Sequence, residues 1–140
     1  MHSRDKLLEK FDCNPGASDE GIRDAEAALG HTLPEDYVAF LRHTNGGCGW
    51  IGLRYTALFA ADELAEMNRI ARVDEFQPGL LIFGGNGGLE NYGFDKRKSR
   101  PWPVVMIPGI SLGFEDAIVQ GASFSEFLQY IYDHNEWDKS

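Results

Sequence analysis

The sequence predicts a single α+β domain, and three observations lead to that prediction. The chain has 140 residues, within the range of roughly 100–200 that one domain occupies. Hydrophobic residues make up 43% of it and aromatic residues 12%, enough for a core without disulfide or metal support. Segments with helical periodicity come first, segments with strand character follow, and a helical segment closes the chain. This order fits one compact α+β domain with a helical N-terminus and a C-terminal helix.

A short first helix is predicted over 7–11. Leu7, Leu8 and Phe11 recur there at helical spacing. The sequence Cys-Asn-Pro-Gly at 13–16 then ends the segment with turn-forming residues.

Two longer helices follow in the first third. Ser18 is a good N-cap for the first of them, and Gly30 is the expected C-terminal stop. Pro34 suits the first position of the second helix, which should end at Asn-Gly-Gly, 45–47. An apolar stripe at i, i+3 and i+4 gives this helix its core face: Tyr37, Phe40 and Leu41.

The middle of the chain combines strands with one helix. Residues 50–59 contain β-formers and predict a strand. Residues 62–73 predict a helix with one apolar side made of Leu64, Met67, Ile70 and Ala71. Residues 80–83 and 91–95 predict two strands, and the glycine-rich segment 84–88 between them predicts the turn of a hairpin.

The last third continues with strands and one helix. The basic tract 96–100 predicts a solvated loop, 103–107 a strand that starts at a proline, and 114–119 an edge strand interrupted by acids. Ser123 and Glu126 form a capping-box pattern. The helix that follows them has apolar residues at helical spacing: Phe124, Phe127, Leu128 and Ile131.

The charge balance narrows the choice of partners. Thirteen basic and 22 acidic residues give a net charge of −9. Such a charge repels nucleic acid and anionic membrane surfaces, so we expect neither as a direct partner, whereas a basic protein is complementary. Two acidic groups are candidates for binding it: Asp62, Glu63, Glu66, Asp74 and Glu75 around the middle helix, and Glu115 and Asp116 in the last quarter. Further late acids are Glu126, Asp133, Glu136 and Asp138.

The cysteines and the absence of targeting patterns predict a cytoplasmic location. Cys13 and Cys48 are too few for a disulfide framework, and two free thiols in a reducing cytoplasm are expected, with one bridge between them as the alternative. We expect no secretory signal, because the N-terminus lacks an apolar stretch, and no apolar run approaches the ~20 residues that span a bilayer.

No group of residues predicts catalysis, a cofactor or a metal. The four histidines are scattered and lack zinc-ligand spacing. The segment 84–88 is not followed by the helix start of a phosphate-binding loop, which favours a hairpin turn over an anion site. Cys48 lies in a glycine-rich loop with His43 close in sequence, but nearness along the chain does not place the imidazole on the thiol, so a structural role for Cys48 is favoured. We therefore expect a non-enzymatic protein.

One segment resembles a known family. Its pattern is Glu26, Leu29, Gly30, His31, Leu33, Pro34, Tyr37, Phe40 and Leu41, followed by Asn45, Gly46 and Gly47. This resembles the N-terminal signature of the SUKH superfamily (Smi/Knr-like domains), and the segment Tyr-Gly-Phe-Asp at 92–95 and the last helix are also similar to it. The resemblance runs from about residue 16 to 132. It implies a single domain over 1–140, core about 16–135, with a mixed, mainly antiparallel sheet and packed helices.

The resemblance also implies a function. Many members of this family are bacterial immunity proteins that neutralise a polymorphic toxin, often a nuclease, and others regulate the cell wall or signalling. A structural role is expected for the motif residues, namely Leu33, Pro34, Tyr37, Phe40, Leu41, Asn45, Gly46 and Gly47. The leading hypothesis is an immunity protein that binds a cognate basic toxin. The alternatives are a regulatory or scaffold domain for endogenous cytoplasmic proteins and, more distantly, an enzyme or ligand-binding domain using the loops around Cys48 and 84–88.

Overall fold

In the computed structural model, which describes residues 2–109 and 113–134, three helices dominate the first third of the chain. They are α1 (Arg4–Leu7), α2 (Asp19–Leu29) and α3 (Glu35–His43). The Ser18 hydroxyl accepts a hydrogen bond from the Gly21 amide (3.0 Å) at the start of α2, and Gly30 ends the helix with φ +85°. Pro34 lies one position earlier than predicted, at the N-cap of α3.

The strands form one seven-stranded sheet in which neighbours in sequence are neighbours in space. The strands are β1 (Lys10–Cys13), β2 (Gly47–Ile51), β3 (Arg54–Leu58), β4 (Leu80–Gly85), β5 (Glu90–Asp95), β6 (Val104–Pro108) and β7 (Ile118–Gly121). All six pairings among the described strands are antiparallel. The predicted α+β class is confirmed, with an antiparallel meander as its sheet.

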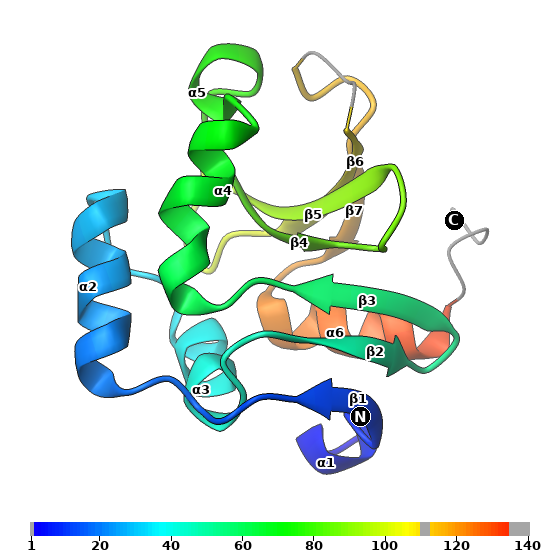
Figure 1. Ribbon diagram of the computed structural model, residues 1–140. Helices are drawn as coiled ribbons and strands as arrows, with labels where there is room; N and C mark the ends of the chain where they lie inside the picture. The colour runs from blue at the N-terminus through cyan, green and yellow to red at the C-terminus, as the bar shows by residue number, and fades with distance from the viewer. Residues whose placement is uncertain (1, 110–112, 135–140) are drawn as a thin grey trace.

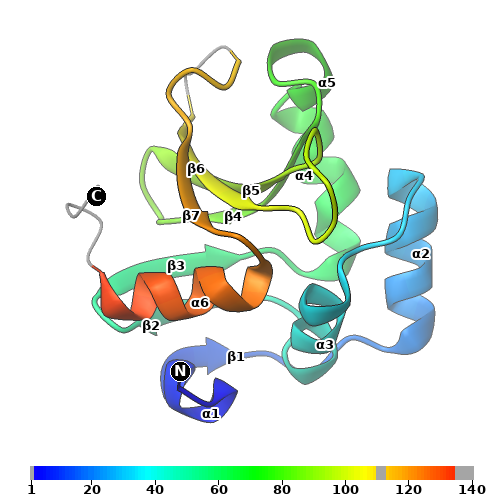
Figure 2. The same ribbon diagram turned by 180° about the vertical axis from the view of Figure 1, so that it is seen from behind.

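One side of the sheet is covered by helices. β2 and β3 pass in front of α6 (Phe124–Asp133) in Figure 1, and α6 passes in front of them in Figure 2. The Ser123 hydroxyl accepts from the Glu126 amide (3.2 Å) at the start of α6, as its sequence predicts. Tyr37 of α3 and Phe124 of α6 meet Phe83 and Phe94 of the sheet, with ring centroids 4.8–6.3 Å apart. We call this aromatic layer the main core.

The opposite side of the sheet is covered over only half its width. A smaller cluster buries Val73, Leu80, Ile82, Val105 and Ile107, with Phe59, Phe114 and Ala117 packed against it. The segment 113–117 and α5 (Val73–Phe76) contribute its covering residues. Over β1–β3 this side is exposed: Cys48, Trp50 and Tyr55 face solvent.

The prediction of the first helix is wrong in its C-terminal half. The helix α1 ends at Leu7, and Phe11 lies in β1, paired with Gly49 of β2. A Cβ atom on Gly49 would come within 2.9 Å of the Lys10 carbonyl oxygen, and its φ is +141°. Glycine in β2 therefore lets β1 approach closely, and this long-range pairing overrides the local helical spacing of Leu7, Leu8 and Phe11.

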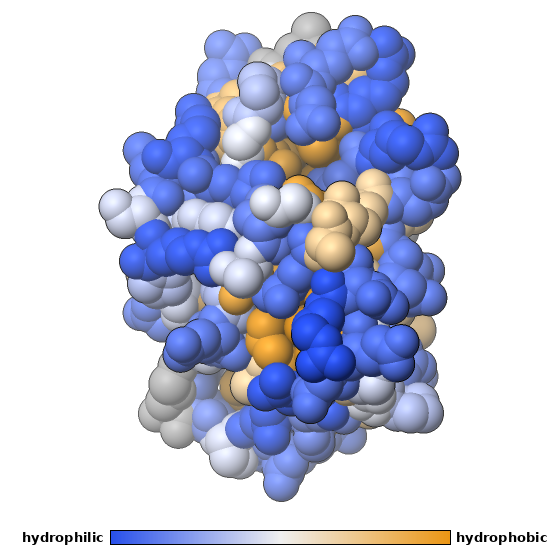
Figure 3. Space-filling model, turned by 90° about the vertical axis from the view of Figure 1, so that its left-hand side faces the viewer, coloured by the Kyte–Doolittle hydropathy of each residue, from blue (hydrophilic) through white to orange (hydrophobic). Residues whose placement is uncertain are grey.

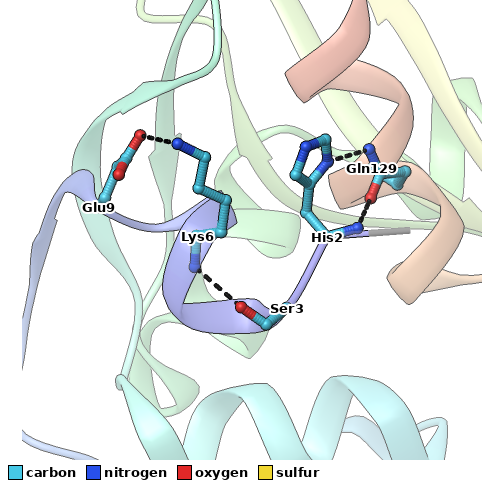
Figure 4. Close-up of polar contacts among 5 residues, drawn as sticks. All are labelled: His2, Ser3, Lys6, Glu9 and Gln129. Carbon is cyan, nitrogen blue, oxygen red and sulfur yellow. Dashed lines mark hydrogen bonds and ion pairs between the residues drawn. The ribbon is translucent and has the colours of Figure 1, made fainter.

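The N-terminal segment is anchored to the last helix (Figure 4). The His2 amide donates to Gln129 Oε1 (2.7 Å), and the Gln129 amide nitrogen lies 2.9 Å from His2 Nδ1. Ser3 caps α1 through the Lys6 amide (3.3 Å), and the Lys6 side chain pairs with Glu9 (3.1 Å). The contacts between His2 and Gln129 hold the segment that precedes α1 beside α6.

The single strand predicted over 50–59 is in fact two strands, β2 and β3, joined by a tight turn. Gly52 stands in this turn with φ +60°, and a Cβ atom there would lie 2.2 Å from the Tyr132 carbonyl oxygen of α6. The turn therefore requires glycine for both its backbone conformation and its contact with α6.

The helix predicted over 62–73 is broken into three pieces. They are η1 (Ala61–Glu63), α4 (Leu64–Ile70) and α5, and Arg72 separates α4 from α5 with φ +56°. The predicted apolar side is only partly buried: Leu64 is in the core, but Met67, Ile70 and Ala71 are exposed. Asn68 is buried instead, because its side chain satisfies backbone groups of the sheet.

The two later strand predictions need smaller corrections. Gly84 and Gly85 belong to β4, so the hairpin turn is formed by 86–89, and the predicted hairpin is otherwise confirmed. The strand predicted over 114–119 runs over 118–121 as β7, at the edge of the sheet as expected. Across the described ranges, none of the helices combines the length and apolar character needed to cross a bilayer.

Candidate functional site

Five of the seven acids predicted to contact a partner lie on η1, α4 and α5. All five are exposed: Asp62, Glu63, Glu66, Asp74 and Glu75. Two are paired within their own helices, Glu66 with Arg69 and Glu75 with Arg72. The Arg69 guanidinium lowers the pKa of Glu66 through this contact. Pairing reduces the negative field that these two carboxylates present to a partner.

The other three acids of this group differ in their roles. Glu63 accepts a hydrogen bond from the Ala60 amide (2.7 Å) and so caps η1. Asp62 and Asp74 form no ion pair within the described part of the chain. Figure 3 shows that the side of the molecule formed by α2, α4 and α5 is largely hydrophilic, with a narrow band of hydrophobic side chains in its middle.

Glu115 and Asp116 lie close to α5. The Gly113 amide donates to the Phe76 carbonyl oxygen (2.9 Å), which joins the segment 113–117 to the end of α5. The segment 113–117 and α5 both lie at the upper end of the molecule in Figure 1. Asp74 and Glu75 therefore lie on α5, and Glu115 and Asp116 on the segment that is bonded to it, while Asp62, Glu63 and Glu66 lie on η1 and the start of α4. We call the first four the acidic end.

An ion pair with a buried carboxylate and a half-exposed arginine links the segment 113–117 to the sheet. The Asp95 carboxylate of β5 accepts from Arg97 Nε (2.9 Å) and Nη2 (3.0 Å), and the Arg97 guanidinium lies 3.5 Å from the Phe114 ring centroid. The Asp95 side chain is only 5% exposed. Its pKa is lowered by Arg97, so the pair is charged at neutral pH.

Two other cations of the basic tract, Lys96 and Arg100, also contact other parts of the chain. Lys96 Nζ lies 3.0 Å from His31 Nε2, and Arg100 donates to the Thr32 carbonyl oxygen and stacks on Trp102 (4.2 Å). Burial, followed by the charges of Lys96 and Arg100, lowers the pKa of His31. Intramolecular contacts therefore engage most of the cations that the sequence predicted to form a solvated loop.

The two thiols lie on neighbouring strands but on opposite sides of the sheet. Cys48 pairs with Asp12, whereas Cys13, the next residue, pairs with Gly47. Both cysteines are free and exposed, in agreement with the predicted free thiols. The Tyr55 hydroxyl lies against the Cys48 thiol, and this contact raises the pKa of Tyr55.

Metal and phosphate sites were the other chemical candidates. Among the described residues, no group of three or more histidine, cysteine, aspartate or glutamate side chains could hold a metal ion. The first two glycines of 84–88 are strand residues, and β5 rather than a helix follows the turn. The cluster thus has the geometry of a hairpin.

The motif residues lie in the main core or at its connections. Four of them are 0–3% exposed: Leu33, Tyr37, Phe40 and Leu41. The Leu33 amide donates to Glu26 Oε2 (2.7 Å), which ties the end of α2 to the start of α3. Asn45 Oδ1 accepts from the Ala61 amide (2.7 Å), and Gly46 makes the turn after α3 with φ +72°. Their contacts connect α2, α3 and η1.

The sequence reasoning missed an exposed aromatic pair on β2 and β3. Trp50 and Tyr55 oppose each other across the hairpin, with ring centroids 5.9 Å apart and ring planes at 79°. They are 51% and 39% exposed. The alternation in Gly47–Ile51, with Cys48 and Trp50 outward and Ile51 inward, was the signal that could have found this pair.

The fold is an α+β domain in which helices cover one side of an antiparallel meander. The motif of residues 26–47 lies in the buried connections between its helices. A model of the SMI1/KNR4 family (SUKH-1) matches residues 16–130, and the chain belongs to this family. The resemblance noted in the sequence is thereby confirmed. No curated protein matches the sequence.

Proposed function

We propose that this protein is a non-enzymatic immunity protein that neutralises a basic bacterial toxin, such as a nuclease, by direct binding. The observation that carries the proposal is the acidic end, where α5 and the segment 113–117 join through the bond between Gly113 and Phe76. The four acids of these two segments, Asp74, Glu75, Glu115 and Asp116, are all exposed. Membership of the SUKH-1 family supports the proposal.

The charge of the molecule supports the choice of partner. At −9, it attracts a cationic protein at long range and repels nucleic acid and anionic membranes. Inhibition would follow from covering the cationic active site of the toxin, since a nuclease must present positive charge to its own substrate. The free thiols are consistent with action in the cytoplasm.

Co-expression with the toxin-like product of an adjacent gene tests the proposal. We expect the two proteins to co-purify as a complex and cells that make both to survive. Absence of both binding and protection would reject it. Capture of an endogenous cell-wall or signalling protein in place of a toxin would support the regulatory alternative.

A further inference from the structure

The register of the sheet places two exposed aromatic residues, Trp50 and Tyr55, on one side. Paired residues of neighbouring strands point to the same side, and Trp50 pairs with Tyr55. On the same side, Ala57 of β3 pairs with Gly85 of β4, which pairs with Asn91 of β5. Asn91 in turn pairs with Ile107 of β6, a residue of the smaller cluster. We call this side, opposite the main core, the open side. Over β1–β3, which Figure 1 views from this side, the described residues place no helix on it.

The aromatic pair on the open side is held in a defined arrangement. The Tyr55 hydroxyl contacts Cys48, and the hairpin turn after β4 lies so close that a Cβ atom on Gly87 would be 2.9 Å from Tyr55 Cδ1. A pocket of about 230 Å³ at the turn between β2 and β3 is lined by Trp50 and Leu53 together with Leu7 and Tyr132 from the main-core side. Exposed tryptophan and tyrosine side chains in contact with each other are typical of protein interfaces.

An acid and a base, Asp12 and Lys10, flank this aromatic pair, and further acids lie elsewhere on the same side of the sheet. Asp12 pairs with Cys48 and so stands on the open side, near enough to contribute to the raised pKa of Tyr55. The acidic end lies on the same side, because α5 and the segment 113–117 cover the smaller cluster there. Glu9, at the pocket, is paired with Lys6, and Lys10 opposes Trp50. Apart from Lys10, the charges beside the pair are therefore acidic or already paired.

We infer that the open side is the docking surface for a basic protein, with Trp50 as its anchor. Arginine or lysine side chains of the partner would stack on Trp50 and Tyr55 and pair with Asp12, while the acidic end contacts the cations around them. Cation–π contact is strongest on tryptophan, and a nearby carboxylate can form charge-assisted hydrogen bonds with the same arginine or lysine. This inference deepens the proposed function and rests on it.

Variants of the full-length protein test the anchor against the captured toxin. We expect Trp50→Ala to weaken the complex about tenfold or more, and Trp50→Phe, which keeps an aromatic face, by no more than about threefold. Asp12→Asn should weaken it by about threefold to tenfold, and the matched change Asp24→Asn, on α2, by less than about twofold. All three positions are exposed, so circular dichroism should show unchanged folding.

A second measurement does not require the toxin. Titration with an arginine-rich peptide, followed by NMR, should shift the Trp50 indole signal and the amides of β1–β3, and a glutamine-for-arginine peptide should not. Shifts confined to α2, or none at Trp50, would overturn the inference, as would self-association abolished by Trp50→Ala. If the wild type binds its toxin and Trp50→Ala binds equally well, the docking surface is wrong and the proposed function stands. If the wild type neither binds nor protects, the proposed function itself fails.

Discussion

Tyr37 is a family-motif residue with a polar atom in the main core. It is 1% exposed, and its hydroxyl has no hydrogen-bond partner among the described residues. Burial strongly raises the pKa of this phenol. Because the hydroxyl has lost its hydration without gaining a bond, its ring rather than its oxygen stabilises the fold.

Replacing Tyr37 by Phe should therefore leave the free energy of unfolding unchanged or raise it by up to about 1 kcal/mol. Urea denaturation of both proteins measures this difference. Tyr37→Leu, which removes the ring, is the control and should cost about 2 kcal/mol or more. A loss above about 1 kcal/mol in Tyr37→Phe would contradict the account, since it would show that the hydroxyl has a partner.

His31 gives the stability of the protein a pH dependence. Its Nδ1 lies 3.0 Å from the Thr32 carbonyl oxygen and its Nε2 3.0 Å from Lys96 Nζ, an arrangement that suits the neutral ring. The pKa is lowered in the folded state, so the stabilisation is complete above the ordinary value of 6.5 and is lost as pH falls through the lowered pKa.

Denaturation midpoints at about pH 7.5 and pH 5.5 measure the effect. The wild type should be less stable at the lower pH, and His31→Gln should reduce this difference. His134→Gln is the control, because His134 is also partly buried and its Nδ1 also lies near a carbonyl oxygen, that of Tyr130 (2.9 Å). An identical pH response of His31→Gln and the wild type would contradict the role of His31.

Among the helices, α4 depends on a polar contact that its sequence pattern conceals. Asn68 Oδ1 accepts from the Ile82 amide, and Asn68 Nδ2 donates to the Ile82 carbonyl oxygen, both at 2.8 Å. β3 and β4 pair only through Ala57 and Leu58, so no β3 residue pairs with Ile82. Asn68 takes the place of a neighbouring strand there.

Asn68→Ala should destabilise the protein by about 2–4 kcal/mol, because two buried backbone groups lose their partner. Thermal or urea unfolding measures the change, and hydrogen exchange should show faster exchange of the Ile82 amide. Arg69→Ala, on the exposed side of the same helix, should change stability by less than about 0.5 kcal/mol. Equal effects of the two substitutions would show that the hydrogen bonds between Asn68 and Ile82 do not stabilise the protein.

The elements also show where sequence reasoning succeeds and fails. The helices begun by Ser18 and Ser123 were predicted because a local cap and an apolar stripe specify them. Phe11 was assigned to a helix because its partner strand begins 36 positions later, and the burial of Asn68 was missed because its backbone contact is 14 positions away. The sequence analysis named the acids of the candidate site. It could not predict their division between the two ends of α4 or the Trp50–Tyr55 pair, because both depend on tertiary structure.

On the scale of the whole molecule, the charge of −9 should govern how fast the partner arrives. The association rate with a basic toxin should fall on the order of tenfold as salt rises from low to well above physiological concentration, because screening shortens the range of attraction. The dissociation rate should change much less, since packed aromatic contacts limit it. Surface plasmon resonance over a salt series measures both rates, and a salt-independent association rate would contradict electrostatic steering.

The most direct test of the central claim is a titration of the activity of the toxin with the purified protein. Neutralisation by binding predicts that activity falls linearly with added protein and ends at a fixed stoichiometric ratio, with intact toxin recovered from the complex. Loss of activity at a small fraction of that ratio, with chemically altered toxin recovered, would show turnover and contradict a non-enzymatic immunity protein.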